Sequence, residues 1–382
     1  MNTDPNVTRK LAESDGFLTE ETFETVKRAL RQTWFDLLSG GYIEFIDVMG
    51  SDRRIVEAAR TTSNIGAVGD KDDRNLLRYL MRHRHSTPFE FCEIVIKVAI
   101  PMDGWRQWIR HRTASVNEFS TRYSEVPDNY DKTPNDKWRA QSVVNRQGSA
   151  GTLPDEFPDK LEVLPTYTDS DGALRLAPVT KEEVEKHTGW TVFERVEVEG
   201  GNNPGTRLEP LVTFATQTRS EITLGMYLSA REAELHAMLR EIYAERIDLG
   251  VAKEQARKDL PLSTYTVAYW KCDLHNILHF LGLRMDKHAQ LEIRSYANVL
   301  GNNIVAQLFP VTWQAFIDYR LEAVTLTRLD QQVIRYLMTV PAGEANLSPQ
   351  SDMWPAGWGT VKCRERDECI EKLRGLQLLP PA

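Results

Sequence analysis

The sequence predicts an α+β fold in which helices flank an antiparallel sheet. Its clearest strand covers Cys92–Ile100, where every second side chain is apolar or a thiol and the opposite face carries Glu93 and Lys97. This alternation is typical of an antiparallel strand with one face against a core. Similar patterns predict strands over Tyr42–Met49 and Thr264–Cys272, and helical periodicity separates the three.

Helices are expected wherever apolar residues recur every three or four positions. Pro261 and Pro310 should each end one of them, because proline cannot continue the hydrogen-bond ladder. In the longest expected helix, Leu235, Met238 and Leu239 form an apolar stripe together with Ile242. The expected helices are Glu20–Leu38, Ile55–Arg60, Asp73–His83, a short one from Gly104, Tyr227–Asp259, Asp273–Leu283, His288–Leu308, one around Trp313–Ile317, and Asp330–Met338.

The main domain is expected over residues 41–320, with an N-terminal extension over 1–40 and a C-terminal extension over 321–382. Residues from about 152 to 222 turn rich in Pro, Gly, Asp and Thr and read as an insertion. Within it, Thr180 and Glu183 form a capping-box pattern for a short helix, and Thr191–Glu199 alternates like one arm of a hairpin. Surface elaboration is the favoured interpretation, because long inserted loops cost little closure entropy.

Composition excludes several classes of function. The chain has 382 residues, 41% of them hydrophobic, and a formal net charge of −8, which argues against a surface generally basic for nucleic acid or anionic lipid. No apolar run approaches the length of a membrane span, and the N-terminus lacks a signal-peptide pattern, so a cytoplasmic protein is expected. The four cysteines are scattered without a C-x-x-C pair, so neither a disulfide framework nor a metal site is expected.

One segment reverses the overall charge. Residues 106–123 carry four arginines and one histidine against a single acid, Glu118. Guanidinium groups match phosphate oxygens, and the hydroxyls and amide around them add donors, so an anion-binding site is predicted here. The alternative is a solvated face whose arginines pair with acids elsewhere. A nucleophilic serine is not favoured, because no G-x-S-x-G elbow or ordered triad accompanies Ser115 or Ser120.

Within this segment Arg110-His111-Arg112, seven residues and then Ser120 reproduce the R-H-R-x7-S signature of the flavin-dependent thymidylate synthases. The chain resembles that family over about Tyr42–Ser149 and Tyr227–Tyr319. Further matching positions are Ser115, Asn117, Glu118, Arg122 and Tyr123, the segments 80–90 and 138–149, Ala256-Arg257, Leu260-Pro261, Phe280 to Arg284 and His288 to Gln290.

The resemblance implies the family fold, an antiparallel sheet flanked by helices, and FAD as the cofactor. Arg110 would face both FAD and the nucleotide dUMP, with Glu118 between the two ligands. The implied dUMP-binding residues are Gln107, Arg110, Glu118, Phe119, Ser120, Thr121, Arg122, Arg257 and Arg284. The implied FAD-binding residues are His85, Thr87, Arg110, His111, Arg112, Glu118, Asp273, His275, His279 and His288.

The resemblance also makes Arg284 the catalytic residue, since a guanidinium beside the uracil ring stabilises negative charge there without a protein nucleophile. From spacing alone, Arg284 could equally be a cation at a helix C-terminus. One departure from the family concerns FAD: Asp273-Leu274-His275 stands where members commonly have Asn-x-Arg, so FAD is held differently or less tightly. Cys92 lies on the apolar face of a strand and is interpreted as an inert thiol.

The implied reaction converts dUMP to dTMP, with methylenetetrahydrofolate as carbon donor and NADPH as the source of reducing equivalents for FAD. Family members are homotetramers with sites between subunits, and no nucleic acid or membrane partner is implied. Two alternatives stay open at this point. One is a relative that acts on another pyrimidine nucleotide or makes a different one-carbon product, and the other is a nucleotide- or RNA-binding module that has lost the chemistry.

Overall fold

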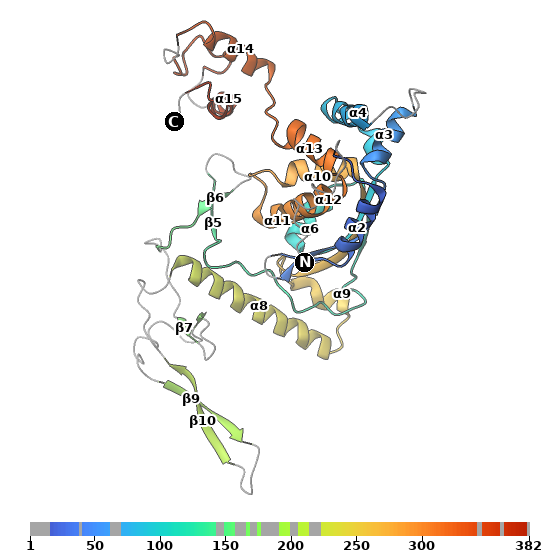
Figure 1. The fold of residues 1–382 in the computed structure, drawn as a ribbon. Coiled ribbons are helices and arrows are strands. Elements are labelled where there is room, and N and C mark those ends of the chain that lie inside the picture. Colours follow the sequence, from blue (N-terminus) through green and yellow to red (C-terminus); the bar gives the residue numbers. More distant parts are fainter. Residues whose placement is uncertain are drawn as a thin grey trace. The chain divides into compact units, whose positions relative to one another are not determined.

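A five-stranded antiparallel sheet organises the first of two units, Met1–Phe316 and Ile317–Ala382, into which the chain divides in the computed structural model (Figure 1). The structure describes residues 16–37, 40–61, 70–142, 149–156, 166–168, 174–176, 191–198, 205–213, 223–341, 346–359 and 363–379. The strand order is β1-β2-β3-β11-β4, and every neighbouring pair is antiparallel. The strands are β1 (Trp34–Asp36), β2 (Tyr42–Met49), β3 (Glu93–Pro101), β4 (Ser115–Glu118) and β11 (Tyr265–Asp273).

The alternation predicted for Cys92–Ile100 is confirmed in β3. Ile94, Ile96, Val98 and Ile100 are fully buried, whereas Glu93 and Lys97 on the other face are partly exposed. The short edge strand β4, which lies in the basic segment, was not expected from periodicity, because it is only four residues long and all its side chains are exposed.

Helices pack on the buried face of this sheet, as Figure 1 shows for α6 (Met102–Trp108), α10 (Leu274–Arg284) and α11 (Leu291–Val299). Their shared core is aromatic. The ring of Trp108 lies 4.5 Å from that of Phe280 and 5.4 Å from that of Trp270, and all three side chains are almost completely buried. Burial of two tryptophans and a phenylalanine gives this corner a large apolar stabilisation, which anchors the C-terminal end of α6.

The helix expected over His288–Leu308 is interrupted. It consists of α11, a π-helical segment over Leu300–Val305 and α12 (Ala306–Leu308), and α13 (Pro310–Phe316) follows after Pro310 as expected. The π segment contains Gly301, where an added Cβ would lie 2.7 Å from the Trp313 ring and 3.0 Å from the Met285 sulfur. Close packing against these side chains therefore accompanies the irregular turn, which apolar periodicity does not reveal.

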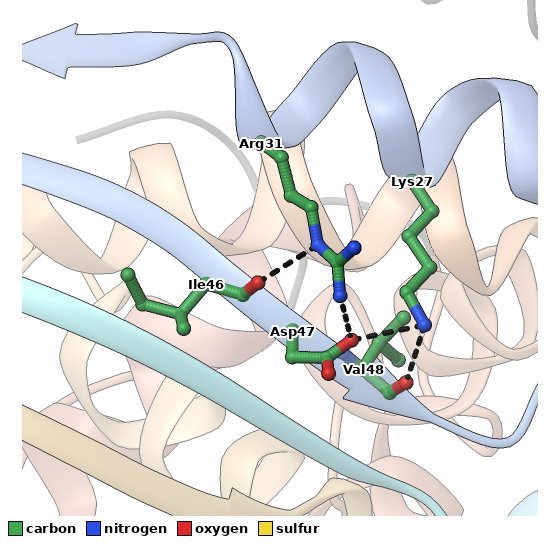
Figure 2. A network of polar contacts seen from close by, with 5 residues as sticks. All are labelled: Lys27, Arg31, Ile46, Asp47 and Val48. Atoms are coloured by element: carbon green, nitrogen blue, oxygen red, sulfur yellow. Dashed lines mark hydrogen bonds and ion pairs between the residues drawn. The ribbon is translucent and has the colours of Figure 1, made fainter.

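The helix α2 (Glu20–Arg31) ends earlier than expected, because the chain turns into β1, and it is tied to β2 by polar contacts (Figure 2). Asp47 accepts from Lys27 at 2.9 Å and from Arg31 at 2.8 Å. Ile46 is the extra residue of a β-bulge, and its carbonyl accepts from Arg31 Nε at 3.1 Å. Residues assigned to the N-terminal extension thus pack on the sheet, with Leu30 fully buried.

The helix expected over Tyr227–Asp259 is α8 (Leu224–Asp248), which ends shortly before Gly250 with φ +78°, followed by α9 (Lys253–Ala256) and a 3₁₀ turn, Arg257–Asp259. The apolar stripe is not its buried face, since Leu235 and Met238 are 50% and 54% exposed. His236 and Tyr243 are buried instead. His236 stacks on Tyr130 at 4.7 Å, and the Tyr243 hydroxyl accepts a backbone N–H at 3.1 Å, so hydrogen bonding and stacking decided the orientation.

The remaining elements of the first unit are helices and hairpin strands outside the five-stranded sheet. In the region of the insertion, β9 (Thr191–Val198) pairs with β10 (Gly205–Thr213), which confirms the expected hairpin arm, while the helix expected at Thr180 lies outside the described residues. The other elements are α3 (Asp52–Arg60), α4 (Asp70–Arg82), α5 (Thr87–Glu90), β5 (Arg139–Gln141) with β6 (Ser149–Thr152), and β7 (Thr166–Thr168) with β8 (Leu174–Leu176).

The second unit has its own apolar core. The expected helix is α14 (Arg328–Leu337), which begins with a capping box between Thr327 and Asp330. A second helix, α15 (Arg364–Gly375), was not expected, because its sequence is mostly charged. Its Cys369 and Leu373 pack with Val333 and with Trp354 and Trp358. Among the described residues, no helix has the length and apolarity that crossing a membrane requires.

Candidate active site

The basic segment occupies the end of α6, a loop and the edge strand β4. Strand β4 is held by pairing with β11, in which Glu118 lies opposite Ala268 and Ser115 opposite Lys271. Its four side chains are exposed. The buried Trp108 ends α6 immediately before the loop, so an anchored helix and a hydrogen-bonded edge strand fix the two ends of a polar, exposed stretch.

Three arginines of the segment are presented to solvent. Arg106, Arg110 and Arg112 line an open depression of about 540 Å³ together with Ile109. In the part of the chain that the structure describes, none of these three guanidinium groups has a carboxylate partner, whereas Arg122 pairs with Glu254 at 3.4 Å. Pairing with acids elsewhere therefore accounts for Arg122 alone, and the other three remain available to an anion.

Arg284 lies at the end of α10 and turns back onto α6 and the following loop. Its Nε donates to His111 Nε2 at 3.2 Å, and its Nη2 donates to the main-chain carbonyl of Gln107 at 3.1 Å. The ring of His279, one turn earlier on α10, is 5.8 Å from that of His111. Four predicted residues from two segments far apart in the sequence are thus brought together: Gln107 and His111 from one, and His279 and Arg284 from the other.

The electrostatics of this group are unusual for histidine. Burial, then the charge of Arg284 and then His279 lower the pKa of His111 to about 4. His111 is therefore neutral near pH 7, and its Nε2 must be unprotonated in order to accept from Arg284. Burial also lowers the pKa of Arg284, yet an arginine stays charged at any ordinary pH. A fixed positive charge next to a neutral ring is the result.

A second group of predicted residues gathers on β11 and the 3₁₀ turn after α9. Arg257 donates to the hydroxyl of the buried Thr121, and Thr266 donates to Glu118 Oε1 at 2.8 Å. These contacts connect the loop after β4 to the turn that carries Arg257, and they hold the Glu118 carboxylate at the sheet edge. Thr266 was not predicted from the sequence; it lies on β11 two residues before Ala268, which pairs with Glu118 of β4.

Among the other predicted residues, Phe119 donates its backbone N–H to the Val267 carbonyl of β11 at 2.8 Å, whereas no side-chain contact among the described residues joins His85, Thr87, His275 or His288 to either group. His85 and Thr87 are exposed after α4, with the His85 ring 5.8 Å from Tyr79. His288 pairs with Asp286 at 2.8 Å in an exposed turn. Phe119 is 36% exposed, and Ser120 and His275 are partly buried.

Asp273, where the family commonly has asparagine, is the N-cap of α10. Its Oδ1 accepts from the Asn276 backbone N–H at 3.0 Å, and its Oδ2 accepts from the Asn276 side chain at 2.7 Å. Asparagine and aspartate are both favourable caps, so this capping role does not require the carboxylate. The departure from the family at this position is compatible with the same helix start.

Two buried cysteines lie in the sheet next to these groups. Burial raises the pKa of Cys92 to about 12 and also raises the pKa of Cys272, whose thiol donates to the Thr113 carbonyl at 3.2 Å. Both are therefore protonated at neutral pH, and a protonated, buried thiol is a poor nucleophile.

Comparison with known proteins places this architecture. A family model described as thymidylate synthase complementing protein matches residues 44–311. A flavin-dependent thymidylate synthase from Wolbachia pipientis wMel is 34% identical over 348 residues, which cover 90% of this chain and 97% of that protein. Another, from Gluconobacter oxydans (strain 621H), is 35% identical over 329 residues and covers 86% of each chain.

A solved structure of a UMP/dUMP methylase PolB from Streptomyces cacaoi bound with 5-Br UMP aligns with a TM-score of 0.46 and 26% identity, over 75% of this chain and 98% of that chain. The family model spans well over half of the chain, and the two named relatives match it along most of their length. The chain therefore belongs to the flavin-dependent thymidylate synthase family.

Proposed function

We propose that this protein converts dUMP to dTMP with FAD as its cofactor, methylenetetrahydrofolate as carbon donor and NADPH as reductant, and without a protein nucleophile. The observation that carries the proposal is the combination of two features: arginines that have no carboxylate partner in the described part of the chain and that line an open depression, and a partly buried Arg284 fixed beside a neutral histidine. Family membership supplies the reaction class, and these residues supply the chemistry.

The residues fit a dinucleotide cofactor and a nucleotide monophosphate. Arg110 and Arg112 offer planar forks of donors, which suit phosphate oxygens better than a single ammonium group does. Arg257 and Ser120 lie on the turn and the loop that follow α9 and β4, and we assign them to the nucleotide with Gln107, Glu118, Phe119, Thr121 and Arg122. His85, Thr87, His111, His275, His279 and His288 are assigned to FAD together with Arg110, Arg112, Glu118 and Asp273.

Arg284 is proposed as the catalytic residue. Two of its guanidinium nitrogens are engaged by His111 and by the Gln107 carbonyl, which fixes the plane of the group. Its third nitrogen, Nη1, takes part in no contact among the described residues, and we assign it to a uracil oxygen or ring nitrogen. Positive charge held there favours the electron-rich form of the ring, an effect worth about 3 kcal/mol of barrier for one well-placed donor. FAD, when bound, supplies the redox chemistry.

The homotetramer and the cytoplasmic location belong to the same proposal. The site residues lie on an exposed sheet edge, and Leu235 and Met238 on α8 present apolar surface that association of subunits would cover. Light scattering on the purified protein should give four times the mass of the chain. A monomeric protein with full activity would remove this part of the proposal.

The decisive experiment is release of the C5 hydrogen of the uracil ring by the FAD-loaded protein, measured with labelled dUMP. Arg284→Ala should reduce the rate of release by about a hundredfold or more while FAD content stays normal. Arg335→Ala, on the exposed surface of α14, is the matched control and should not change the rate. Equal release from dCMP would point to a broader pyrimidine specificity, and no release from either nucleotide would refute the proposal.

A further inference from the structure

Gln107 is tied to the start of α11 through two side chains that the sequence did not single out as functional. Its Nε2 donates to Gln290 Oε1, and Gln290 Nε2 donates to Asp103 Oδ2 at 2.8 Å. Asp103 and Gln107 lie one turn apart on α6, and Gln290 occupies the N-cap position of α11. The three side chains are all partly buried and form one hydrogen-bonded chain.

The direction of this chain is fixed by the carboxylate. An ionised carboxylate only accepts, so Gln290 must turn its NH₂ group toward Asp103 and its carbonyl toward Gln107. Gln107 must then donate from Nε2 to Gln290, so that the Oε1 atom of Gln107 points away from Gln290. Asp103 is itself held in place, because its other oxygen accepts from the Gly104 backbone N–H at 2.7 Å.

The chain ends next to the proposed catalytic group. Arg284 Nη2 donates to the main-chain carbonyl of Gln107 at 3.1 Å, so the Gln107 backbone and the guanidinium are held together. The oxygen and the NH₂ group of a side-chain amide have nearly the same shape. If the amide could rotate by 180°, it would bind a hydrogen-bond donor and an acceptor equally well. Here the carboxylate at Asp103 removes that freedom.

We infer that Asp103 and Gln290 are positioning residues that orient the Gln107 amide, so that its carbonyl oxygen faces the nucleotide and selects a ligand group that donates a hydrogen. An N–H of the uracil ring or a sugar hydroxyl has this chemistry. The inference rests on the proposed function, in which Gln107 contacts dUMP. It adds the reason why Gln107 accepts a hydrogen bond from the nucleotide and does not donate one.

Packing of α6 on α11 does not depend on these polar groups. The Trp108 and Tyr296 rings lie 6.2 Å apart at the same interface, and the buried Tyr296 hydroxyl donates to the Ala99 carbonyl at 2.7 Å. A change of polarity at Gln290 should therefore leave the fold and the FAD content intact, and should act on nucleotide binding alone.

Three variants test the polarity: Asp103→Asn, Gln290→Glu and the double variant that carries both changes. Gln290→Glu places two carboxylates together, and Asp103→Asn lets the Gln290 amide turn over. In the double variant the amide at position 103 donates to the carboxylate at position 290. That carboxylate accepts from Gln107 Nε2, so the Gln107 amide keeps the orientation that it has in wild type. We expect the Kd of dUMP to rise about tenfold in Gln290→Glu and about fivefold in Asp103→Asn, the size of one hydrogen bond. It should return to within about twofold of wild type in the double variant.

The Kd is read from the change in flavin absorbance when dUMP is added to the FAD-loaded protein, with Tm and FAD content as controls. Turnover at saturating dUMP should stay within about threefold of wild type while KM rises, which separates positioning from catalysis. If Gln290→Glu lowers Tm, Gln290→Met supplies a neutral replacement of similar size that should weaken binding to the same extent. Analogues of dUMP with a methylated N3 or without the 3′-hydroxyl identify the donor, because discrimination against one of them should disappear in Gln290→Met.

A double variant that binds dUMP as weakly as Gln290→Glu would overturn the inference, and so would single variants that bind like wild type. Wild-type protein that binds no dUMP would overturn the proposed function along with it, so the two failures are distinguishable.

Discussion

Replacing Arg284 by methionine should raise the pKa of His111, and the structure sets the size of the change. The ordinary pKa is 6.5, and in the folded protein it falls to about 4, a difference of roughly 2.5 that corresponds to a free energy on the order of 3 kcal/mol. Burial is the largest cause, followed by Arg284 and then His279. Arg284 therefore accounts for less than half of the difference.

Its removal should raise the pKa of His111 from about 4 by less than half of that difference, because burial, the larger cause, remains. The direction follows from Coulomb repulsion, because a guanidinium within hydrogen-bond distance of the ring disfavours its protonated, positively charged form. The same shift has a stability consequence. Between pH 6.5 and about 4, His111 is protonated in the unfolded chain but neutral in the folded protein, so its contribution to the free energy of unfolding is lost as pH falls. In the variant the folded pKa lies nearer 6.5, so the pH range over which this loss occurs is narrower.

The assay is a pH titration of the Cε1–H resonances in protein labelled with ¹³C-histidine. The chain has eight histidines, and a His111→Gln sample identifies the signal. Wild type should show a midpoint of about 4 and Arg284→Met a higher midpoint that stays below 6.5, while Arg335→Met should match wild type. A wild-type midpoint near 6.5, or a variant whose midpoint stays at about 4, would refute the assigned electrostatics.

Three further predictions concern groups away from Arg284. Cys92 and Cys272 should resist iodoacetamide in the native protein at pH 8, because burial raises the pKa of both thiols, and alanine at each position should keep turnover; a hundredfold loss would contradict the absence of a nucleophile. Burial raises the pKa of Asp52 from 3.8 to about 6, so its contribution to stability declines as pH rises through that window. In urea unfolding, the difference in stability between Asp52→Asn and wild type should therefore change by about 2 kcal/mol between pH 4 and pH 7, and a constant difference would contradict this. Gly225→Ala places a Cβ 1.9 Å from a facing backbone oxygen and should cost about 1–3 kcal/mol in thermal unfolding, whereas Gly282→Ala, with its nearest neighbour at 3.9 Å, should be neutral.

The sequence alone predicted those helices and strands in which buried side chains recur at a regular spacing along the chain. The strand over Cys92–Ile100 could be predicted because its alternation matches the pleat, and the basic segment because its charge contrasts with an acidic chain. The R-H-R-x7-S signature likewise required no folding, since it lies in eleven consecutive residues, and it led to the family that the comparisons show.

Tertiary structure decided what depends on partners far along the chain. The exposed stripe of Leu235 and Met238 looked like a core face, but stacking and hydrogen bonding turned His236 inward instead. The low pKa of His111 needs a guanidinium 173 positions away, and the direction of the Gln107 amide needs a partner 183 positions away. Composition and periodicity describe each residue with its neighbours in sequence, whereas desolvation, charge pairing and hydrogen-bond polarity arise only when distant segments pack together.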